Sequence, residues 1–218
     1  MKKFIKLYLI LLSTLFLNSQ SIAQSTGDAY LNKISAIAMI NRNSEEKPDI
    51  YKQSITYLND CLKYYPSDHE AYFYRGLAKM SLNKNTEAIN DFTKAIQLRD
   101  VEPLIGAYHN RAICKIELKQ YKEALKDLEM VKKWDPYTKD GIYTLFGKCN
   151  FYLGNIDEAK KNVEKAINAY PEIYDNFYTR GLIKLKENDK VGACEDFTKA
   201  KELGFKKSID SEMKAACN

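Results

Sequence analysis

The residues that most often carry chemistry are few in this sequence of 218 residues, which has two histidines and five cysteines. His109 lies five residues before Cys114, and this is not the spacing that places two side chains on one face of a helix. A cysteine–histidine nucleophile is therefore not indicated. No zinc-ligand spacing, glycine-rich phosphate loop or nucleophilic serine motif occurs. The sequence predicts no catalytic residues, no metal site and no cofactor.

One charged pair does recur, an arginine followed sixteen residues later by an aspartate. The pairs are Arg75–Asp91, Arg111–Asp127 and Arg180–Asp196. In a further copy of the surrounding pattern, Phe146 and Asn162 replace both members. Because the two residues change together, we expect a bidentate ion pair between neighbouring helices. The alternative is that the charges lie on two solvated faces, where such pairs are common and weak.

The elements that position these pairs repeat along the chain every 34 to 36 residues. A small residue follows each arginine position, and twelve residues later comes an alanine. A large apolar residue follows that alanine by four residues, and a small or aliphatic one follows it by seven. The small residues are Gly76, Ala112, Gly147 and Gly181, and the alanines are Ala88, Ala124, Ala159 and Ala193. Each copy thus predicts two helices, since apolar residues at i, i+4 and i+7 share one helix face.

This pattern resembles the tetratricopeptide repeat family. The resemblance implies an all-α fold, a right-handed superhelical solenoid of stacked antiparallel helix pairs. It predicts an array over 35–205, with a weak repeat over 35–68 and clear repeats over 69–102, 105–138, 140–173 and 174–205. Where the family usually has an aromatic residue, this chain has Lys79, Lys115, Asn150 and Lys184. Extra residues stand near Val101–Pro103 and Pro136–Gly141, where the stack is expected to bend.

Residues 1–23 have the pattern of a secretory signal peptide. Lysines precede the apolar run Leu7–Leu17, and small residues end at Ala23, where cleavage is expected. An uncleaved anchor is the alternative, but eleven apolar residues are too few to span a bilayer. No cysteine follows Ala23, which disfavours a lipid anchor, so no stable membrane insertion is expected after cleavage. The prediction is export across the inner membrane, to the periplasm or alternatively to the medium, with residues 24–34 leading into the first helix.

The C-terminal end, residues 206–218, is predicted to cap the array. Gly204 can end the last repeat helix, and Ser208 can begin a capping helix that runs to Cys217. We expect either a disulfide between Cys194 and Cys217 that ties the cap down, or two small apolar residues packed without a bond. The other cysteines occupy core positions of the repeats and are expected to be buried thiols; they are Cys61, Cys114 and Cys149.

In the family that the repeats resemble, the first helix of each pair lines a concave groove. The resemblance places a set of apolar and aromatic residues on that face. They are Phe73, Leu77, Met80, His109, Ile113, Ile116, Phe151, Tyr152, Tyr178 and Leu182. Such a surface usually marks a partner site, and a helix or an extended peptide can lie in it. The alternative for each residue is ordinary packing against neighbouring helices. Positions that hold acidic chaperone tails in related proteins are largely apolar here, so that carboxylate clamp is not expected.

The formal net charge is +5, from 34 basic and 29 acidic residues that are interspersed along the chain. This is not the charge pattern of a nucleic-acid-binding protein. The predicted function is a non-catalytic scaffold in the cell envelope that holds an unidentified protein partner in its groove. The alternative is an architectural spacer, or a module that self-associates through Asp28–Asn43.

Overall fold

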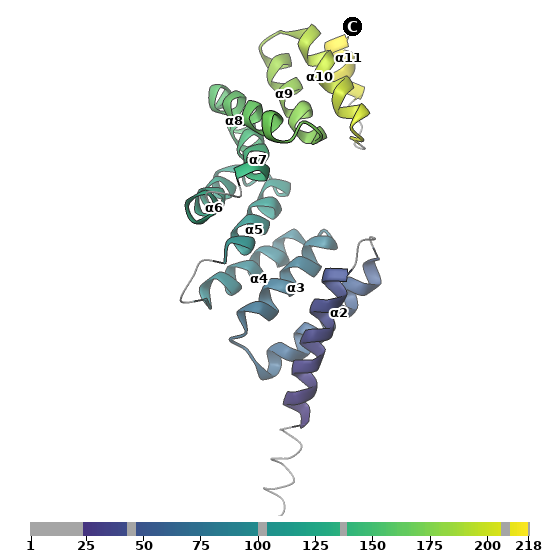
Figure 1. Ribbon diagram of the computed structural model, residues 1–218, viewed down its shortest axis with the longest axis vertical. Coiled ribbons are helices and arrows are strands. Elements are labelled where there is room, and N and C mark those ends of the chain that lie inside the picture. The colour runs from purple at the N-terminus through teal and green to yellow at the C-terminus, as the bar shows by residue number, and fades with distance from the viewer. Residues whose placement is uncertain (1–23, 43–46, 100–103, 136–138, 206–209, 218) are drawn as a thin grey trace, which may run out of the picture. The chain divides into compact units, whose positions relative to one another are not determined.

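The computed structural model describes residues 24–42, 47–99, 104–135, 139–205 and 210–217 (Figure 1). Within these ranges the chain forms helices joined by short connections, and no strand. No helix in them has both the length and the apolar character that crossing a membrane requires. The predicted signal peptide, residues 1–23, lies outside the described residues, as do Val101–Pro103 and Ser208.

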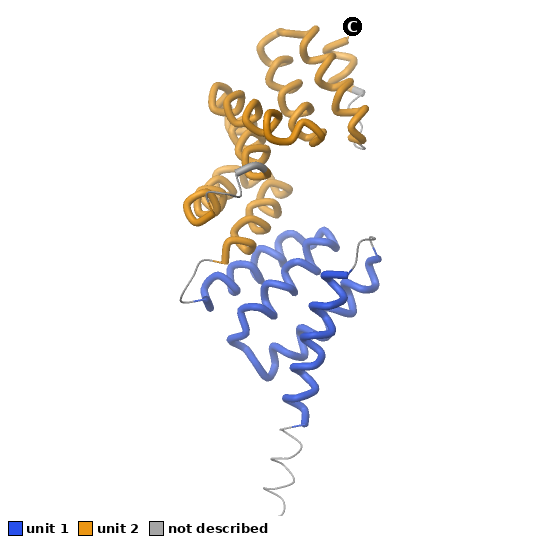
Figure 2. Tube along the Cα trace, viewed as in Figure 1, with its two compact units in different colours: residues 1–102 blue, residues 103–218 orange. Residues whose placement is uncertain are grey.

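The chain divides into two compact units, residues 1–102 and 103–218 (Figure 2). Unit 1 holds an N-terminal helix over residues 24–42, then α2 (Pro48–Tyr64), α3 (His69–Ser81) and α4 (Asn85–Gln97). Unit 2 holds α5 (Ile105–Glu117), α6 (Tyr121–Trp134), α7 (Lys139–Tyr152), α8 (Ile156–Ala169), α9 (Tyr174–Lys186), α10 (Lys190–Glu202) and α11 (Asp210–Cys217). The most extensive helix contacts join α3 with α4, α5 with α6, α7 with α8, and α9 with α10. The predicted all-α class of stacked helix pairs is confirmed.

Small residues let the two helices of each pair approach closely. A Cβ atom added to Gly181 would lie 2.6 Å from the ring of Phe197, and one added to Gly76 would lie 2.7 Å from the ring of Phe92. In the α5–α6 pair, Ala112 is tolerated because Leu128, and not an aromatic ring, occupies the opposite position in the same core cluster. The anchor residue and its large partner therefore match in size in these three pairs, whereas Gly147 faces the smaller Val163, whose Cγ2 atom would lie 2.5 Å from an added Cβ atom.

Each first helix ends in a turn that needs a left-handed backbone conformation. The residues with positive φ at these turns are Asn83 (57°), Lys119 (60°), Gly154 (84°) and Asn188 (64°). Glycine and asparagine adopt this conformation readily, whereas in a lysine it brings the Cβ atom too close to the backbone and is strained. Gly204, with φ at 95°, ends α10 in the same way. These turns reverse the chain and set the second helix of each pair beside the first.

The N-terminal helix begins earlier than predicted. Residues 24–34, expected as a lead-in, are helical, and Ala29 and Ala36 are fully buried. Ala36 packs in one cluster with Leu58 of α2, so Ala36 takes the place of the small anchor residue in this pair. Six more residues separate the anchor from its large partner here than in the clear repeats. The spacing of the clear repeats therefore does not apply to the weak repeat.

Candidate functional site

A hollow of about 550 Å³ lies in unit 2 along its first helices. We call it the α5–α7–α9 hollow. Its walls come from His109 and Ile113 of α5, from Thr144 and Leu145 of α7, and from residues 172–175 where α9 begins. Because the surface is mostly apolar and open on one side, it can receive side chains of a bound segment.

Beside the hollow, buried polar contacts link α7 to α9 and α9 to the residue that follows α8. The Thr144 hydroxyl donates a hydrogen bond to Asn176 Oδ1 at 2.6 Å, and Asn176 Nδ2 donates to the Tyr170 carbonyl at 3.3 Å. Thr144 and Asn176 are both buried. At the edge, Lys148 Nζ lies 3.4 Å from Asp175 Oδ2. Satisfied buried hydrogen bonds hold the two helices at a defined distance, so the hollow is formed before any ligand binds.

His109 is the histidine among the residues that line this hollow. Burial lowers the pKa of His109 from its usual value, since a desolvated imidazolium is disfavoured. The ring is therefore neutral at neutral pH and offers one hydrogen-bond donor and one acceptor. It can contact an amide or a hydroxyl of a ligand, and it adds no positive charge that would select acidic ligands.

Of the predicted groove residues, His109 and Ile113 line this hollow. Three others lie in unit 1 on α3. Phe73 is half-buried and packs edge-on against Tyr74 and tilted against Phe92. Leu77 is half-buried, and Met80 lines a separate hollow of about 470 Å³ with Pro48 and Tyr51 of α2. The prediction thus covers parts of two surfaces, one in each unit.

The other predicted groove residues belong to the packing of unit 2. The prediction for Ile116 is wrong, because its side chain is 4% exposed in the core cluster with Leu128. Phe151 packs against Val163 and Ile183. Tyr152 is exposed, and its ring stacks on that of Tyr121 with centroids 4.7 Å apart. The repeat pattern predicts which residues share a helix face, but it does not predict how far neighbouring helices cover that face.

Tyr178 and Leu182 are covered by the C-terminal end of the chain. The Tyr178 ring stacks on Phe205 with centroids 4.6 Å apart, and its hydroxyl donates to Glu212 of α11 at 3.2 Å. Burial raises the pKa of Tyr178, and the nearby Glu212 carboxylate raises it further. Leu182 packs beside Ala216 in the same cluster. Both residues therefore contact the C-terminal cap, and the prediction that they line the groove is wrong.

Most of the lining residues were not predicted from the sequence, and three of them are consecutive: Ile173, Tyr174 and Asp175. They lie at the turn into α9, two repeats beyond the helix that supplies His109. Asp175 lies six residues before the small residue Gly181, just as Glu70 lies six residues before Gly76. The repeat register could have found Asp175, whereas Ile173 precedes the helix and has no periodic signal.

The structure brings the three arginine–aspartate pairs together, and each is bidentate. Arg111 Nε and Nη2 lie 2.9 and 2.6 Å from the two oxygens of Asp127. A lysine joins each pair, as Lys115 Nζ does at 2.7 Å from Asp127 Oδ2. The equivalent third partners are Lys79 and Lys184. The lysines that depart from the family pattern thus complete ion triads, which the sequence analysis did not foresee.

The fourth repeat lacks all three members of the triad. Phe146, Asn150 and Asn162 replace arginine, lysine and aspartate, and all three side chains are buried. Asn150 Nδ2 donates to the Phe146 carbonyl and Asn162 Nδ2 to the Glu158 carbonyl. The substitution exchanges a charged cluster for a neutral one, so no buried charge is left without a partner. The triads and their neutral replacement are structural and lie apart from the hollow.

The cysteines divide into one disulfide and three buried thiols. Cys194 of α10 and Cys217 of α11 form the disulfide. Cys61, Cys114 and Cys149 are free and buried. Burial raises the pKa of Cys114 to about 11 and that of Cys149 to about 12, so both remain protonated and unreactive at neutral pH. In the part of the chain that the structure describes, no group of three or more potential metal ligands occurs.

Comparison with known proteins agrees with this architecture. The tetratricopeptide repeat model matches residues 69–101, 105–138 and 141–173. Heat shock protein STI1 of Saccharomyces cerevisiae is 34% identical over 98 residues, which cover 45% of this chain and 16% of STI1. The chain spans less than a third of the length of the curated relatives it matches.

Solved structures extend the similarity to most of the chain. MamA from Desulfovibrio magneticus RS-1 superposes with a TM-score of 0.67 at 25% identity, over 81% of this chain and 94% of that one. YrrB, a TPR protein with an unusual peptide-binding site, has a TM-score of 0.66 at 19% identity, over 85% of this chain and 91% of its own. At that identity YrrB shows the fold alone. The chain therefore contains tetratricopeptide repeats, stacked as helix pairs.

Proposed function

We propose that this protein is a non-catalytic scaffold of the bacterial cell envelope that holds a segment of a partner protein in the α5–α7–α9 hollow. The observation that carries the proposal is the hollow itself, an apolar surface of about 550 Å³ on rigid helices. A preformed surface lowers the entropy cost of binding. A peptide-binding site in YrrB, which shares the fold, supports a peptide ligand.

The chemistry of the walls describes the segment that would fit. Ile113 and Leu145 favour aliphatic or aromatic side chains, and the neutral His109 favours a polar group of the ligand backbone. Glu172 stands at one edge, next to the Lys148–Asp175 ion pair, so a basic residue of the ligand would be attracted to the Glu172 carboxylate. The expected ligand is an apolar segment with a flanking lysine or arginine.

The test is selection of peptides from a displayed random library on the folded protein. We expect enriched peptides to lose at least about tenfold in affinity for Ile113→Glu, because a carboxylate would be buried against the bound segment. The matched control is Leu153→Glu, which alters an equally apolar but exposed residue outside the hollow. Peptides that bind wild type and Ile113→Glu equally would refute the proposal for this hollow.

Export is the second part of the proposal. The charged, apolar and small segments of residues 1–23 support it, and a disulfide suits an oxidising compartment. Cell fractionation with N-terminal sequencing tests it. We expect the protein outside the cytoplasm and beginning at Gln24; a cytoplasmic chain that retains Met1 and Lys2 would contradict export.

Self-association is the competing function, and one observation favours it. Tyr30, Leu31 and Ile34 of the N-terminal helix are 52%, 63% and 47% exposed. Three large apolar side chains on one exposed stretch can pair with a second copy. Sedimentation analysis of wild type and Leu31→Glu tests this. A monomer at all concentrations rejects self-association, and an oligomer that Leu31→Glu dissolves would favour the architectural function.

A further inference from the structure

Besides its structural role, the neutral replacement of the ion triad leaves a space in the α7–α8 pair. In the α9–α10 pair, Arg180 spans the gap between Asp196 of α10 and Glu164 of the preceding second helix, at 2.7 and 3.3 Å. Phe146 holds the arginine position of the α7–α8 pair, and its ring is buried in the core of unit 2. A hollow of about 310 Å³ lies between α6, α7 and α8, and we call it the neutral hollow.

Two buried asparagines line the neutral hollow, and each has unused hydrogen-bonding capacity. Asn150 and Asn162 are 6% and 8% exposed. Asn150 Nδ2 uses one of its two N–H groups for the Phe146 carbonyl. Asn162 Nδ2 donates to the Glu158 carbonyl, but Asn162 Oδ1 accepts no hydrogen bond from any residue that the structure describes. Among those residues, the one fully enclosed side-chain polar atom without a partner is His69 Nδ1, so the Asn162 oxygen is open to the hollow.

These inner groups favour an uncharged ligand. In the three triads, an aspartate receives cations and a lysine lies beside it. Asn162 replaces the aspartate and offers a cation no counter-charge, and Asn150 replaces the lysine and offers an anion none. A charged group brought beside the two amides would lose its water without gaining an ionic partner, which is costly.

The charges at the rim of the neutral hollow are balanced. The rim residues are Lys126, Glu129 and Lys132 of α6 and Glu158 of α8. All four are exposed. Lys132 pairs with Glu129 at 3.6 Å, and its Nζ atom lies 5.6 Å from the centre of the Phe146 ring. Two cations and two anions give the rim no net attraction for a ligand of either sign.

We propose that the neutral hollow binds a primary carboxamide, the group that ends a glutamine or asparagine side chain. This group is uncharged and carries two N–H donors and an oxygen acceptor. It can donate to Asn162 Oδ1 and accept from the remaining N–H of Asn150, while Phe146 and Leu125 contact its carbon chain. The volume is at the lower end of the roughly 300–1,000 Å³ of ligand pockets, which suits one side chain. The site is separate from the α5–α7–α9 hollow and does not depend on the function proposed for it.

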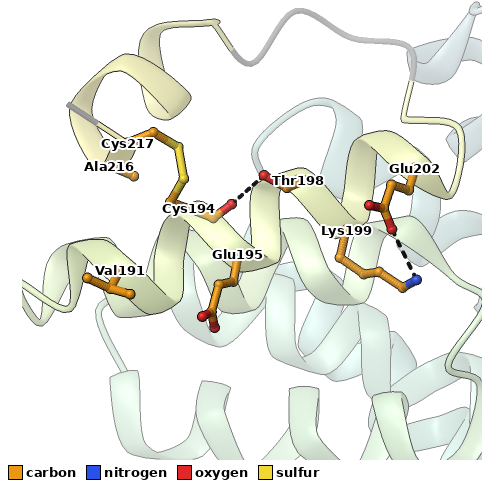
Figure 3. A pocket seen from close by; sticks show the side chains of 8 residues that line it. All are labelled: Val191, Cys194, Glu195, Thr198, Lys199, Glu202, Ala216 and Cys217. Atoms are coloured by element: carbon orange, nitrogen blue, oxygen red, sulfur yellow. Dashed lines mark hydrogen bonds and ion pairs between the residues drawn. A yellow bond between two sulfur atoms is a disulfide. The ribbon is translucent and has the colours of Figure 1, made fainter.

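A hollow of about 510 Å³ beside the disulfide provides a contrast within unit 2 (Figure 3). Its polar side chains are all exposed; they are Glu195, Thr198, Lys199 and Glu202. The Thr198 hydroxyl donates to the Cys194 carbonyl at 2.8 Å, and Lys199 lies 3.2 Å from Glu202. Exposed groups exchange water for a ligand with little net gain, so α10 serves as the control region for binding.

NMR titration of the ¹⁵N-labelled, oxidised protein tests the proposal. The probe is propionamide, and propionate and ethylguanidinium are the charged probes of similar size. We expect propionamide to shift the backbone amide signals of residues 125–132 and 158–162 saturably, and those of α10 not at all. Both charged probes should bind at least about tenfold more weakly. A blocked tripeptide with a central glutamine identifies the source: tighter binding than propionamide indicates a side chain of a partner protein, and equal binding indicates a free amide.

Three variants make the result decisive. Asn162→Ala should weaken propionamide binding roughly three- to tenfold, the effect of one hydrogen bond, whereas Asn168→Ala, which alters an exposed residue of the same helix, should not. The triple variant Phe146→Arg, Asn150→Lys, Asn162→Asp restores the triad of the other pairs, so it should fold, fill the hollow and lose binding. The proposal is overturned if propionamide and the glutamine tripeptide both give no saturable shift, if the charged probes bind equally well, or if the triple variant binds as wild type does.

Discussion

Arg180 donates to both oxygens of Asp196, from Nε at 2.9 Å and from Nη2 at 2.7 Å. The aspartate side chain is 4% exposed and the arginine 23%, and the guanidinium carbon lies 5.4 Å from the centre of the Phe177 ring. Arg75 and Arg111 repeat this geometry on Tyr72 and Tyr108. The contact is therefore a standard part of a helix pair in this protein, and its removal is the first prediction.

Asp127→Asn leaves Arg111 and Lys115 without their shared carboxylate. We expect the free energy of unfolding to fall by roughly 3–5 kcal/mol, since breaking a buried ion pair leaves a buried charge without a partner. Urea unfolding followed by circular dichroism measures it. Asn162→Ala is the matched control, because the fourth repeat has no cation at this place, and it should cost much less. Equal losses in the two variants would show that the triad contributes nothing specific.

Gly181→Ala should destabilise the α9–α10 pair. The added Cβ atom would lie 2.6 Å from the Phe197 ring, and overpacking of this kind costs typically about 1–3 kcal/mol. The α5–α6 pair suggests the remedy, since it combines Ala112 with Leu128. The double variant Gly181→Ala, Phe197→Leu should therefore be more stable than the sum of the two single changes predicts. Strict additivity in thermal unfolding would contradict the size-matching argument.

Lys119→Gly should stabilise the protein. Lys119 has φ at 60°, and relief of the Cβ strain is worth about 1 kcal/mol, less the extra entropy that glycine brings to the unfolded chain. Gly154→Ala places a Cβ atom at the equivalent turn and should have the opposite sign. Thermal unfolding of the two variants gives the comparison, and a loss of stability in Lys119→Gly would show that the lysine side chain has a contact worth more than the strain.

Stability should fall as the pH rises above about 9. The pKa of Cys149 is raised by burial to about 12, so above the unfolded value of roughly 8.5 the unfolded chain loses this proton while the folded one keeps it. The stabilisation is complete below the unfolded pKa and is lost as the pH climbs toward the folded one. Cys149→Ala should have a shallower decline between pH 9 and 11, and identical slopes would rule out this thiol as the cause.

Reduction of Cys194–Cys217 should release α11 before the rest of unit 2 unfolds. The loop between them has a sequence separation of 23, and closing such a loop is worth on the order of 3 kcal/mol in the chain-entropy model. Hydrogen exchange of reduced and oxidised protein measures the effect. We expect faster exchange in α11 and unchanged exchange in α7 and α8. Uniform acceleration would mean that the cap and the body unfold together.

The fold was largely predictable because its signal is repeated. The small anchor residues recur in register with their large partners in four repeats, at Gly76, Ala112, Gly147 and Gly181. Four copies of one pattern define the positions of the helices more reliably than a single copy does. The arginine–aspartate pairs were predictable for the same reason, since their joint loss at Phe146 and Asn162 shows that they act together. The N-terminal helix was misplaced because Ala36 occurs in one degenerate copy with a longer connection.

The candidate site was less predictable, because exposure depends on neighbours that lie far apart in sequence. Ile113 and Ile116 belong to the same helix, yet one lines the hollow and the other is buried in the core. Tyr178 has the right place in its repeat, but Phe205 and Glu212 cover it. Periodicity identifies which residues share a face; how much of that face remains open depends on the lengths and ends of adjoining elements.

The guanidinium of Arg180 has one more contact, with Glu164 of the preceding pair at 3.3 Å, and Arg75 likewise reaches back to Asn59 of α2 at 2.7 Å. Each of these arginines is shared by two successive pairs. If one helix pair unfolds, the neighbouring pair loses a side-chain contact to it. The helix face that was covered is exposed to solvent at the same time. Contacts between successive helix pairs therefore contribute part of the stability of the array. We therefore expect helices α7 to α10 to unfold in one cooperative transition, and not one pair after another.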